Sequence, residues 1–472
     1  MEYFTLLTLA TLVIVVLAAI LYRRCRDWGV LAGLGALYYW SLYGSWFIVI
    51  DKLGGTSGQH YHYLEYKMFP LALDGNYLLT IATYAGFIIA VELTLLLTLP
   101  QGRAREIPRL VLRHEPILLV GLLAGLASYL VIREKLNAAW DLNTSAYWYT
   151  RAQTGPWFTL HQVLNRVALV PAAIGVATLA AGERSRFFVN VSRRYVWPGY
   201  FALLGSMAAF TLVLGNKNEV FTALITGILA YLGSVRRPDW PKLILAVGMG
   251  LWFLTAIDFF RGTPISRIGE AVVERYHEST DVAHFVASSN EAFAAHFSLY
   301  GVLATGTAPK FGYSLYSLAC SIIPRILWPE RPPDIYLYYS QSVGAIENQG
   351  YSLHHATGWY LNFGYPGVLI GALVLGLLWT RTLTARQRIR KQTGLLFRLA
   401  AVIGPWLFAA GLPPLIRSGP EGYKGFVLEC LLIPVAVLVI ACRPAARRRA
   451  AELRGAREHS RLARAFAAGG AR

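Results

Sequence analysis

The sequence predicts an all-α polytopic membrane protein with about eleven transmembrane helices. Hydrophobic residues make up 55% of the chain and charged residues only 15%, and the mean hydropathy is +0.44. Many apolar runs are about 17 to 24 residues long, which is enough to cross roughly 30 Å of hydrocarbon. Lys and Arg, which give the chain a net charge of +18, gather in alternate turns between these runs, as in cytoplasmic turns of membrane proteins.

Residues 1–258 are expected to contain the first eight helices. The first apolar run follows no basic segment and is followed by Arg23, Arg24 and Arg26, so we expect a retained helix whose N-terminus lies outside. The eight runs lie at about residues 3–22, 29–50, 76–99, 116–132, 161–181, 198–214, 220–233 and 243–257.

Residues 360–442 are expected to form three more helices, at about 360–379, 395–412 and 426–441, followed by a basic cytoplasmic tail, 443–472. Because the basic residues follow the topology, we expect contact with anionic lipid and no binding of nucleic acid. The four cysteines show neither paired nor CxxC spacing, so we expect no disulfide framework, metal site or cofactor.

Two cations on the predicted outer side are candidates for binding an anion, because of the residues next to them in the sequence. Arg151 follows an aromatic cluster that includes Tyr147 and Trp148, and Lys217 lies in the polar turn Gly215–Glu219 between two apolar helices. A helix N-terminus beside a cation suits an anion. A snorkelling Arg in an aromatic belt and a plain capping turn would give the same patterns.

Residues 259–359 are expected to form a large external loop with short helices of its own. Helical periodicity over Thr280–Leu303 places His284, Ser288 and Glu291 on one face, which is either solvated or lines a polar cavity. The apolar run Gly312–Ile323 is too short to span, so we expect a re-entrant or interfacial helix.

Two further features of this loop carry chemistry. Four prolines between residues 323 and 333 predict an extended course that presents Arg325 and Arg331, and Arg suits bidentate phosphate contacts. The pair His354–His355 comes just before the next helix and is either structural or catalytic.

Three motifs resemble the Wzy-type oligosaccharide repeat-unit polymerases, which relate to O-antigen ligases among the GT-C membrane glycosyltransferases. They are Gly-Asn-Lys-Asn-Glu at 215–219, Ile-Pro-Arg-x-Leu-Trp-Pro-x-Arg-Pro-Pro at 323–333 and Asn-Phe-Gly-x-x-Gly at 362–367. The resemblance covers mainly residues 215–376. Members of the family commonly have Arg where this chain has Lys217, and often Glu where it reads Gly358-Trp359.

The resemblance implies a GT-C-like fold and an enzyme of the bacterial inner membrane. Such enzymes join undecaprenyl diphosphate-linked oligosaccharides on the outer face, without metal or nucleotide sugar, to make O-antigen of lipopolysaccharide or exopolysaccharide, and a chain-length regulator is a possible partner. Fixed cations at headgroup depth would stabilise the leaving diphosphate. We expect this role for Arg151, Lys217, Arg261 and Arg325, with Arg331 and Arg267 in reserve.

The attacking sugar hydroxyl needs a proton acceptor, for which His354, His355 and Glu291 are the candidates. A ligase would use the same architecture. A flippase for lipid-linked oligosaccharides is expected to carry more charge within its helices, where the acids are chiefly Glu92 and Glu429.

Overall fold

The structure is a computed structural model that describes residues 2–53, 73–100, 109–191, 194–261, 263–267, 270, 291–325, 327–344, 352–389 and 394–444. The part of the large loop with His284 and Ser288, and the basic tail from residue 445 onward, lie outside the described residues.

Every apolar run that the sequence marks as a span is helical, and eight helices of the described residues are long and apolar enough to cross a membrane. The chain is therefore an all-α membrane-embedded protein, as predicted. The long helices are α1 (Glu2–Cys25), α2 (Trp28–Tyr38) with the π-helical turn Tyr39–Tyr43 and α3 (Gly44–Leu53), α5 (Gly75–Thr98), α6 (His114–Asp141), α8 (Pro156–Ala181), α9 (Val196–Leu214), α10 (Lys217–Ser234), α11 (Trp240–Arg261), α17 (His355–Ala385), α18 (Leu395–Ile416) and α19 (Gly422–Gly425), which continues through the π-helix η5 (Phe426–Leu432) into α20 (Ile433–Ala441).

Several predicted boundaries are wrong by a few residues. Helix α6 continues to Asp141, and α7 (Ala146–Thr154) forms where only an aromatic loop was expected. Helix α17 begins at His355, inside the segment 259–359 assigned to the loop, because His354 caps it: its Nδ1 accepts from the Ala356 N–H at 3.1 Å. The helix then kinks at Gly364, whose φ of +64° favours glycine.

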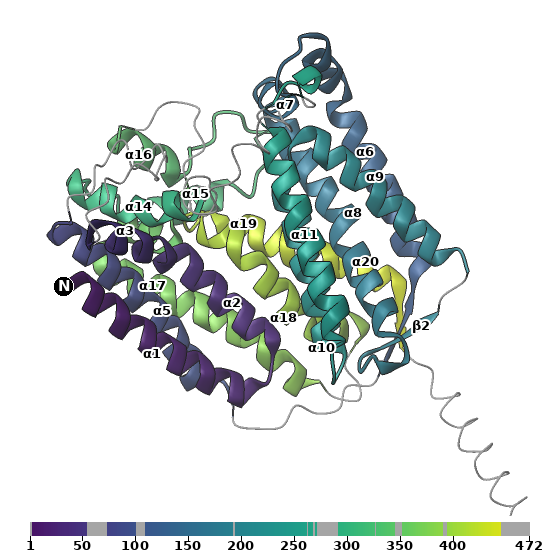
Figure 1. Ribbon diagram of the computed structural model, residues 1–472, viewed down its shortest axis with the longest axis horizontal. Coiled ribbons are helices and arrows are strands. Elements are labelled where there is room, and N and C mark those ends of the chain that lie inside the picture. Colours follow the sequence, from purple (N-terminus) through teal and green to yellow (C-terminus); the bar gives the residue numbers. More distant parts are fainter. Residues whose placement is uncertain are drawn as a thin grey trace, which may run out of the picture.

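The helices form two bundles that share α18 (Figure 1). Helices α1, α2, α5, α14 and α17 surround one apolar core, and α6, α8, α9, α10 and α20 surround the other. Helix α18 packs against α2 and α17 on one side and against α10 and α20 on the other. Its large buried aromatics illustrate the division, because Phe408 belongs to the first core and Trp406 to the second.

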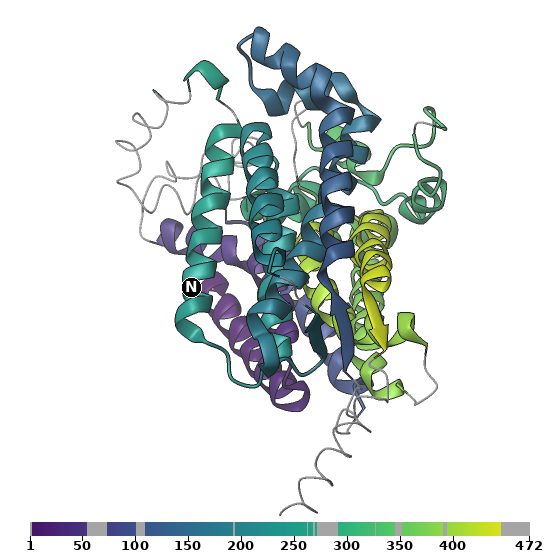
Figure 2. The same ribbon diagram turned by 90° about the vertical axis from the view of Figure 1, so that its right-hand side faces the viewer.

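A small sheet was not predicted. Strand β1 (Leu110–Arg113) pairs in parallel with β2 (Phe188–Val191) and antiparallel with β3 (Cys442–Pro444), and the three strands lie together at the end opposite α7 (Figure 2). These strands come from three segments that the basic residues assign to one side of the membrane. The sheet shows that they share one face of the molecule, which we call the sheet face.

The opposite face, which we call the α7 face, carries the short helices of the large loop (Figure 1). They are α14 (Glu291–Ala304), α15 (Tyr313–Cys320), α16 (Ile335–Ser342) and the 3-10 turn Ile265–Arg267. Asn362, from the Asn-Phe-Gly motif in α17, fixes the start of α15, because its Oδ1 accepts from the Ser314 N–H at 2.8 Å and its Nδ2 donates to Ser314 Oγ at 2.7 Å. The short apolar helix predicted within Gly312–Ile323 is confirmed as α15.

A partly buried ion pair lies where the first bundle meets α18 at the sheet face. Arg386 contacts Asp27 Oδ2 at 3.1 Å and donates to the carbonyl oxygens of Ala401 and Val402 at 3.1 and 2.8 Å. Asp27 Oδ1 accepts from the Gly29 N–H at 2.8 Å and so caps α2. One guanidinium therefore connects the ends of α2, α17 and α18.

Replacing Asp27 by Asn should lower the free energy of unfolding by about 3 kcal/mol, because the amide retains the cap while the partly buried Arg386 loses its counter-charge. Thermal and denaturant unfolding of the detergent-solubilised protein would measure this loss. Arg23→Gln, at an exposed cation in the last turn of α1, is the control and should change little. Equal effects of the two substitutions would contradict the role of the pair.

Candidate functional site

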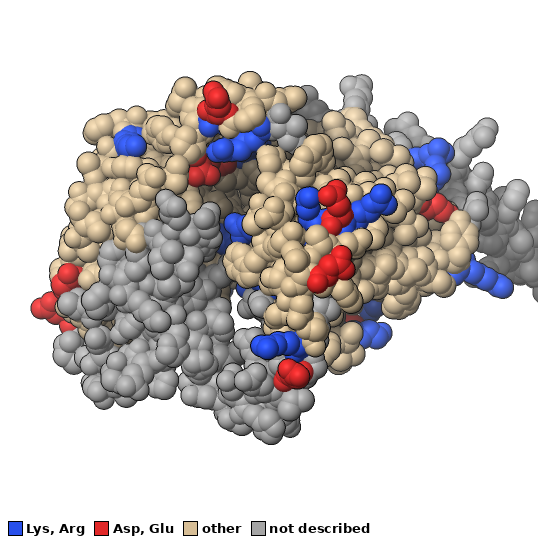
Figure 3. All heavy atoms as spheres, turned by 90° about the horizontal axis from the view of Figure 1, so that it is seen from above, with Lys and Arg blue, Asp and Glu red and all other residues tan. Residues whose placement is uncertain are grey.

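The α7 face is hollowed between the two bundles, and Lys, Arg, Asp and Glu side chains gather around the hollow (Figure 3). Helix ends and short helices of both bundles meet on this face (Figure 1). Charged side chains at the end of a membrane bundle lie at the depth of lipid headgroups, so this face is the natural place to seek a site for an amphipathic ligand.

Helix α7 supplies an aromatic pair, Tyr147 and Trp148, that holds two guanidinium groups. The Cζ of Arg261 lies 4.0 Å from the ring centroid of Tyr147 and 5.3 Å from that of Trp148. Arg151 donates from Nη1 to the Tyr147 hydroxyl at 3.1 Å, and its Cζ lies 5.8 and 5.9 Å from the same two centroids. Cation–π attraction fixes both guanidinium groups here.

Ser145 locks α7 to the end of α11. Its hydroxyl caps α7 by accepting from the Trp148 N–H at 3.4 Å, and it donates to the carbonyl oxygen of Arg261 at 2.6 Å. The two arginines, which are far apart in sequence, are thereby brought to one place. Two cations sharing one aromatic pair repel each other, and a bound anion would relieve that repulsion.

The predicted polar turn packs directly on Arg261. Gly215 has a φ of +76°, and a Cβ there would lie 2.8 Å from the Cα of Arg261, so only glycine fits. Lys217 follows as the first residue of α10. The helix begins before Asn218 and Glu219, so these residues lie in its first turn rather than capping it. Of the predicted diphosphate ligands, Arg151 and Arg261 therefore lie together, and the turn that bears Lys217 packs on Arg261. We call these three residues the cation wall.

A buried histidine holds this turn in place. The Asn216 Nδ2 donates to His161 Nε2 at 2.8 Å, and the opposite ring nitrogen lies 2.8 Å from Ser128 Oγ. Because Nε2 accepts, Nδ1 carries the proton and donates to the serine. Asn216 thus anchors the turn to α8 and α6 instead of capping α10, since its side chain makes no capping bond.

A charged triad lies where the polar turn enters α10, and in it Arg166 of α8 bridges two carboxylates. Its Nη2 is 3.6 Å from Glu219 Oε1, and its Nη1 contacts Glu429 Oε2. Glu219 is fully buried, and Glu429 lies in the π-helix η5. Sequence reasoning singled out Glu429 but missed Arg166, although an Arg in the middle of an apolar helix is the signal that could have found it.

Another carboxylate, that of Glu421, lies where the large loop meets α19. Glu421 Oε1 accepts from the Ile335 N–H at 3.0 Å at the start of α16. Partial burial, together with repulsion from Asp334, raises the pKa of Glu421 to about 7. Glu421 and Glu429 lie roughly two turns apart on one helical segment. Through Arg166 and Glu219, this segment reaches the turn that bears Lys217.

The proline-rich segment does not take the predicted extended course. Its backbone forms consecutive turns, with the N–H groups of Leu327 and Trp328 donating to the Pro324 carbonyl at 2.9 and 3.0 Å. A turn is favoured because proline fixes φ but still allows the turn conformation. Arg331 donates from Nη1 to the carbonyls of Ser321 and Ile323 and so closes the turns, whereas Arg325 is exposed.

His354 is built into the protein interior. Its ring is fully buried, Nδ1 accepts from the Ala356 N–H, and Nε2 lies 2.9 Å from Ser41 Oγ. The ring also packs on Tyr84, with centroids 4.2 Å apart. Both ring nitrogens are therefore occupied, and this geometry favours a structural role.

His355 is equally enclosed. Its Nδ1 donates to the Ser418 carbonyl at 3.1 Å, and its Nε2 accepts from the Trp359 indole N–H at 3.1 Å and lies 3.1 Å from the Tyr423 hydroxyl. The ring is fully buried. A catalytic base at either histidine stays a prediction that none of these contacts supports.

The remaining predicted residues are not brought to the cation wall by any described contact. Arg267 is exposed in its 3-10 turn. Glu291 is the first residue of α14, and its side chain lies outside the described residues. Among the residues that the structure describes, no group of three or more His, Cys, Asp and Glu side chains could hold a metal ion.

No protein-family model matches the chain, and neither a curated protein nor a solved structure matches it.

Replacing His355 by Ala should lower the unfolding temperature of the purified protein, because it leaves a carbonyl, an indole N–H and a tyrosine hydroxyl buried without their partner. Each such group costs about 1 to 3 kcal/mol. The measurement is thermal unfolding beside a glycan-transfer assay. If the variant keeps wild-type stability and loses all activity, the structural role is wrong and the catalytic one regains support.

Proposed function

We propose that the protein is an integral-membrane glycosyltransferase that polymerises undecaprenyl diphosphate-linked oligosaccharide repeat units into O-antigen or exopolysaccharide. The observation that carries this proposal is the stacking of Arg151 and Arg261 on one aromatic pair, against the turn that bears Lys217. In this proposal the α7 face is the outer face of the bacterial inner membrane, and the sheet face is cytoplasmic.

A lipid diphosphate matches the cation wall in two ways: its charge is opposite, and its phosphates lie at the same level of the membrane. It carries its negative charges next to the acyl chain, at the level where membrane-spanning helices end. Cations that are already fixed by aromatic and backbone contacts need little reorganisation when charge develops on the leaving group. Arg261 meets this condition best, because its backbone is held by Ser145 and its side chain stacks on Tyr147.

The proposed reaction forms one bond and breaks one. A hydroxyl oxygen of the acceptor repeat unit attacks the anomeric carbon of the donor, and the bond from that carbon to the diphosphate oxygen breaks. The lipid diphosphate leaves with the electron pair, stabilised by Arg151, Lys217 and Arg261. We assign the hydroxyl proton to Glu421, because this carboxylate lies where the large loop meets α19, bound to the Ile335 N–H, and its pKa of about 7 suits an acceptor near neutral pH. A pH–rate profile unchanged in Glu421→Gln would remove this assignment.

Two other functions share this architecture. A ligase would use the same leaving group and differ only in its acceptor. The triad around Arg166 favours a flippase as a second candidate, since charge within the spans is typical of a translocation path. In the triad, however, each charge faces an opposite one, and this pairing suits a structural link between α8, α10 and η5.

Replacing Arg261 by Gln should lower the rate of glycan transfer about a hundredfold, because one preorganised cation is lost from the leaving group. Arg151→Gln should cost about tenfold, since that side chain is exposed and more screened. Initial rates of reconstituted protein with a lipid diphosphate-linked repeat unit measure both effects.

The matched control is Arg236→Gln, an exposed arginine of the turn before α11, whose loss should leave the rate unchanged. Thermal unfolding checks that all three variants are folded. Wild-type rates in both Arg261→Gln and Arg151→Gln would exclude the cation wall as the diphosphate site.

A further inference from the structure

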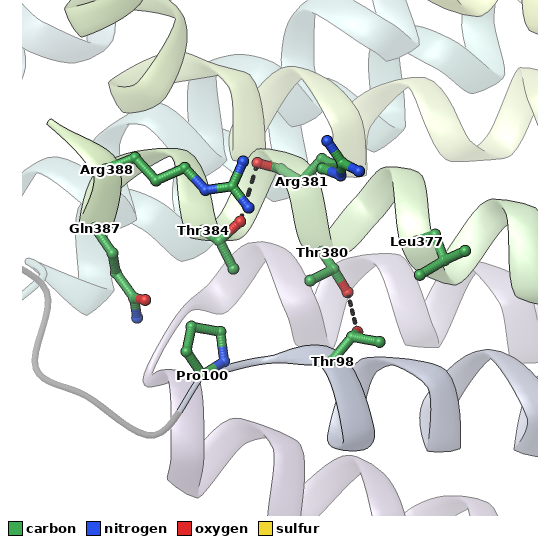
Figure 4. A pocket seen from close by; sticks show the side chains of 8 residues that line it. All are labelled: Thr98, Pro100, Leu377, Thr380, Arg381, Thr384, Gln387 and Arg388. Carbon is green, nitrogen blue, oxygen red and sulfur yellow. Dashed lines mark hydrogen bonds between the residues drawn. The ribbon is translucent and has the colours of Figure 1, made fainter. Parts of the chain in front are cut away.

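A pocket on the sheet face is independent of the site described above. It has a volume of about 350 Å³ and lies between the ends of α5 and α17. In Figure 4, Thr98 and Pro100 from the end of α5 face Thr380, Thr384 and Gln387 of the α17 segment across it. The other lining residues are Leu377, Arg381 and Arg388.

The lining of the pocket changes along α17 from apolar to positively charged residues. Its lining residues recur at helical spacing, so they form one stripe that runs from Leu377 through Thr380 and Arg381 to Arg388. Leu377 is 48% exposed, and Leu97 on the neighbouring helix is 84% exposed, so the apolar end opens onto the surface that faces lipid in a spanning protein. The stripe thus passes from hydrocarbon-like to cationic.

The cationic end lacks a built-in counter-ion among the residues that the structure describes. None of their carboxylates pairs with Arg381 or Arg388, whereas the neighbouring Arg386 has its own ion pair with Asp27. Hydroxyl groups lie between the two ends: Thr98 and Thr380 are 2.7 Å apart, and Thr384 Oγ1 donates to the Arg381 carbonyl at 3.4 Å (Figure 4). These hydroxyl groups donate to carbonyl oxygens of their own helices, so the two guanidinium groups are the part of the pocket that suits a phosphodiester.

We propose that this pocket binds an anionic phospholipid, with the phosphate and headgroup between Arg381 and Arg388 and an acyl chain against Leu377. A phospholipid headgroup and a free phosphate ion both carry anionic oxygen atoms, so the two arginines alone would accept either. The apolar end selects the lipid, since a free ion gains nothing from exposed leucines. Basic pockets between helix ends on one side of a membrane protein are typical sites for such headgroups.

The test uses the full-length protein, delipidated in detergent, and measures binding of phosphatidylglycerol and phosphatidylcholine by native mass spectrometry. The wild type should bind phosphatidylglycerol about ten- to thirtyfold more tightly than does the double variant Arg381→Gln/Arg388→Gln, and should prefer it to phosphatidylcholine. Arg236→Gln/Arg237→Gln removes two exposed charges from another turn and should retain wild-type binding. If the double variant fails to fold, the exposed single variant Arg388→Gln replaces it.

Three results would overturn the proposal. Equal binding of the two lipids would show that the pocket does not recognise negative charge. Equal loss of binding in the two double variants would show general surface electrostatics instead of a site. Competition by inorganic phosphate at the same concentration as the lipid would show that the pocket takes the free ion, and the acyl contact at Leu377 would then be wrong.

Discussion

Charge within the bilayer must be paired, and this constraint shapes the molecule more than any other. An isolated ion in the hydrocarbon costs several kcal/mol, so each buried cation has to meet its acids in folded geometry. Arg166 meets Glu219 and Glu429 and thereby links α8, α10 and the π-helix η5. At the sheet face, Arg386 meets Asp27 and links α2, α17 and α18. Arg386 thereby ties the first bundle to the shared helix α18, and Arg166 ties helices of the second bundle to η5.

Polar groups of the large loop divide into a buried scaffold and an accessible surface. His354, His355 and His296 are fully buried, and their ring nitrogens contact serine, tyrosine and backbone groups. These groups belong to the π-helical turn Tyr39–Tyr43, to α5 and to the segment from Ser418 to α19. These contacts hold α14 and the start of α17 on the first bundle. The cations that remain accessible belong mainly to helix ends and turns, and α7 joins two of them on one aromatic pair. The buried histidines therefore hold the helices around the hollow in place, whereas the accessible cations are able to contact a charged ligand there.

Much of the fold was predictable because apolar length and the placement of Lys and Arg are local properties of the sequence. All the predicted spans are helical, and eight helices of the described residues are long and apolar enough to cross a membrane. The sheet shows that three turns assigned to one side do share a face. The contacts between distant segments were not predictable. Nothing local in the sequence indicates that Gly215 packs on Arg261, that Asn216 binds His161, or that the histidine pair is enclosed by Ser41 and Tyr423. The proline-rich segment was misjudged because proline restricts φ without choosing between extended and turn conformations.

The central claim is that the cation wall on the α7 face serves transfer of a glycan from a lipid diphosphate. Purified protein in vesicles, supplied with one lipid diphosphate-linked repeat unit and neither metal nor nucleotide sugar, tests it most directly by gel analysis of the products. The account predicts a ladder in which successive products differ by one repeat unit. Absence of any elongated product, with the intact lipid-linked glycan crossing the vesicle membrane instead, would contradict the account and establish translocation as the function.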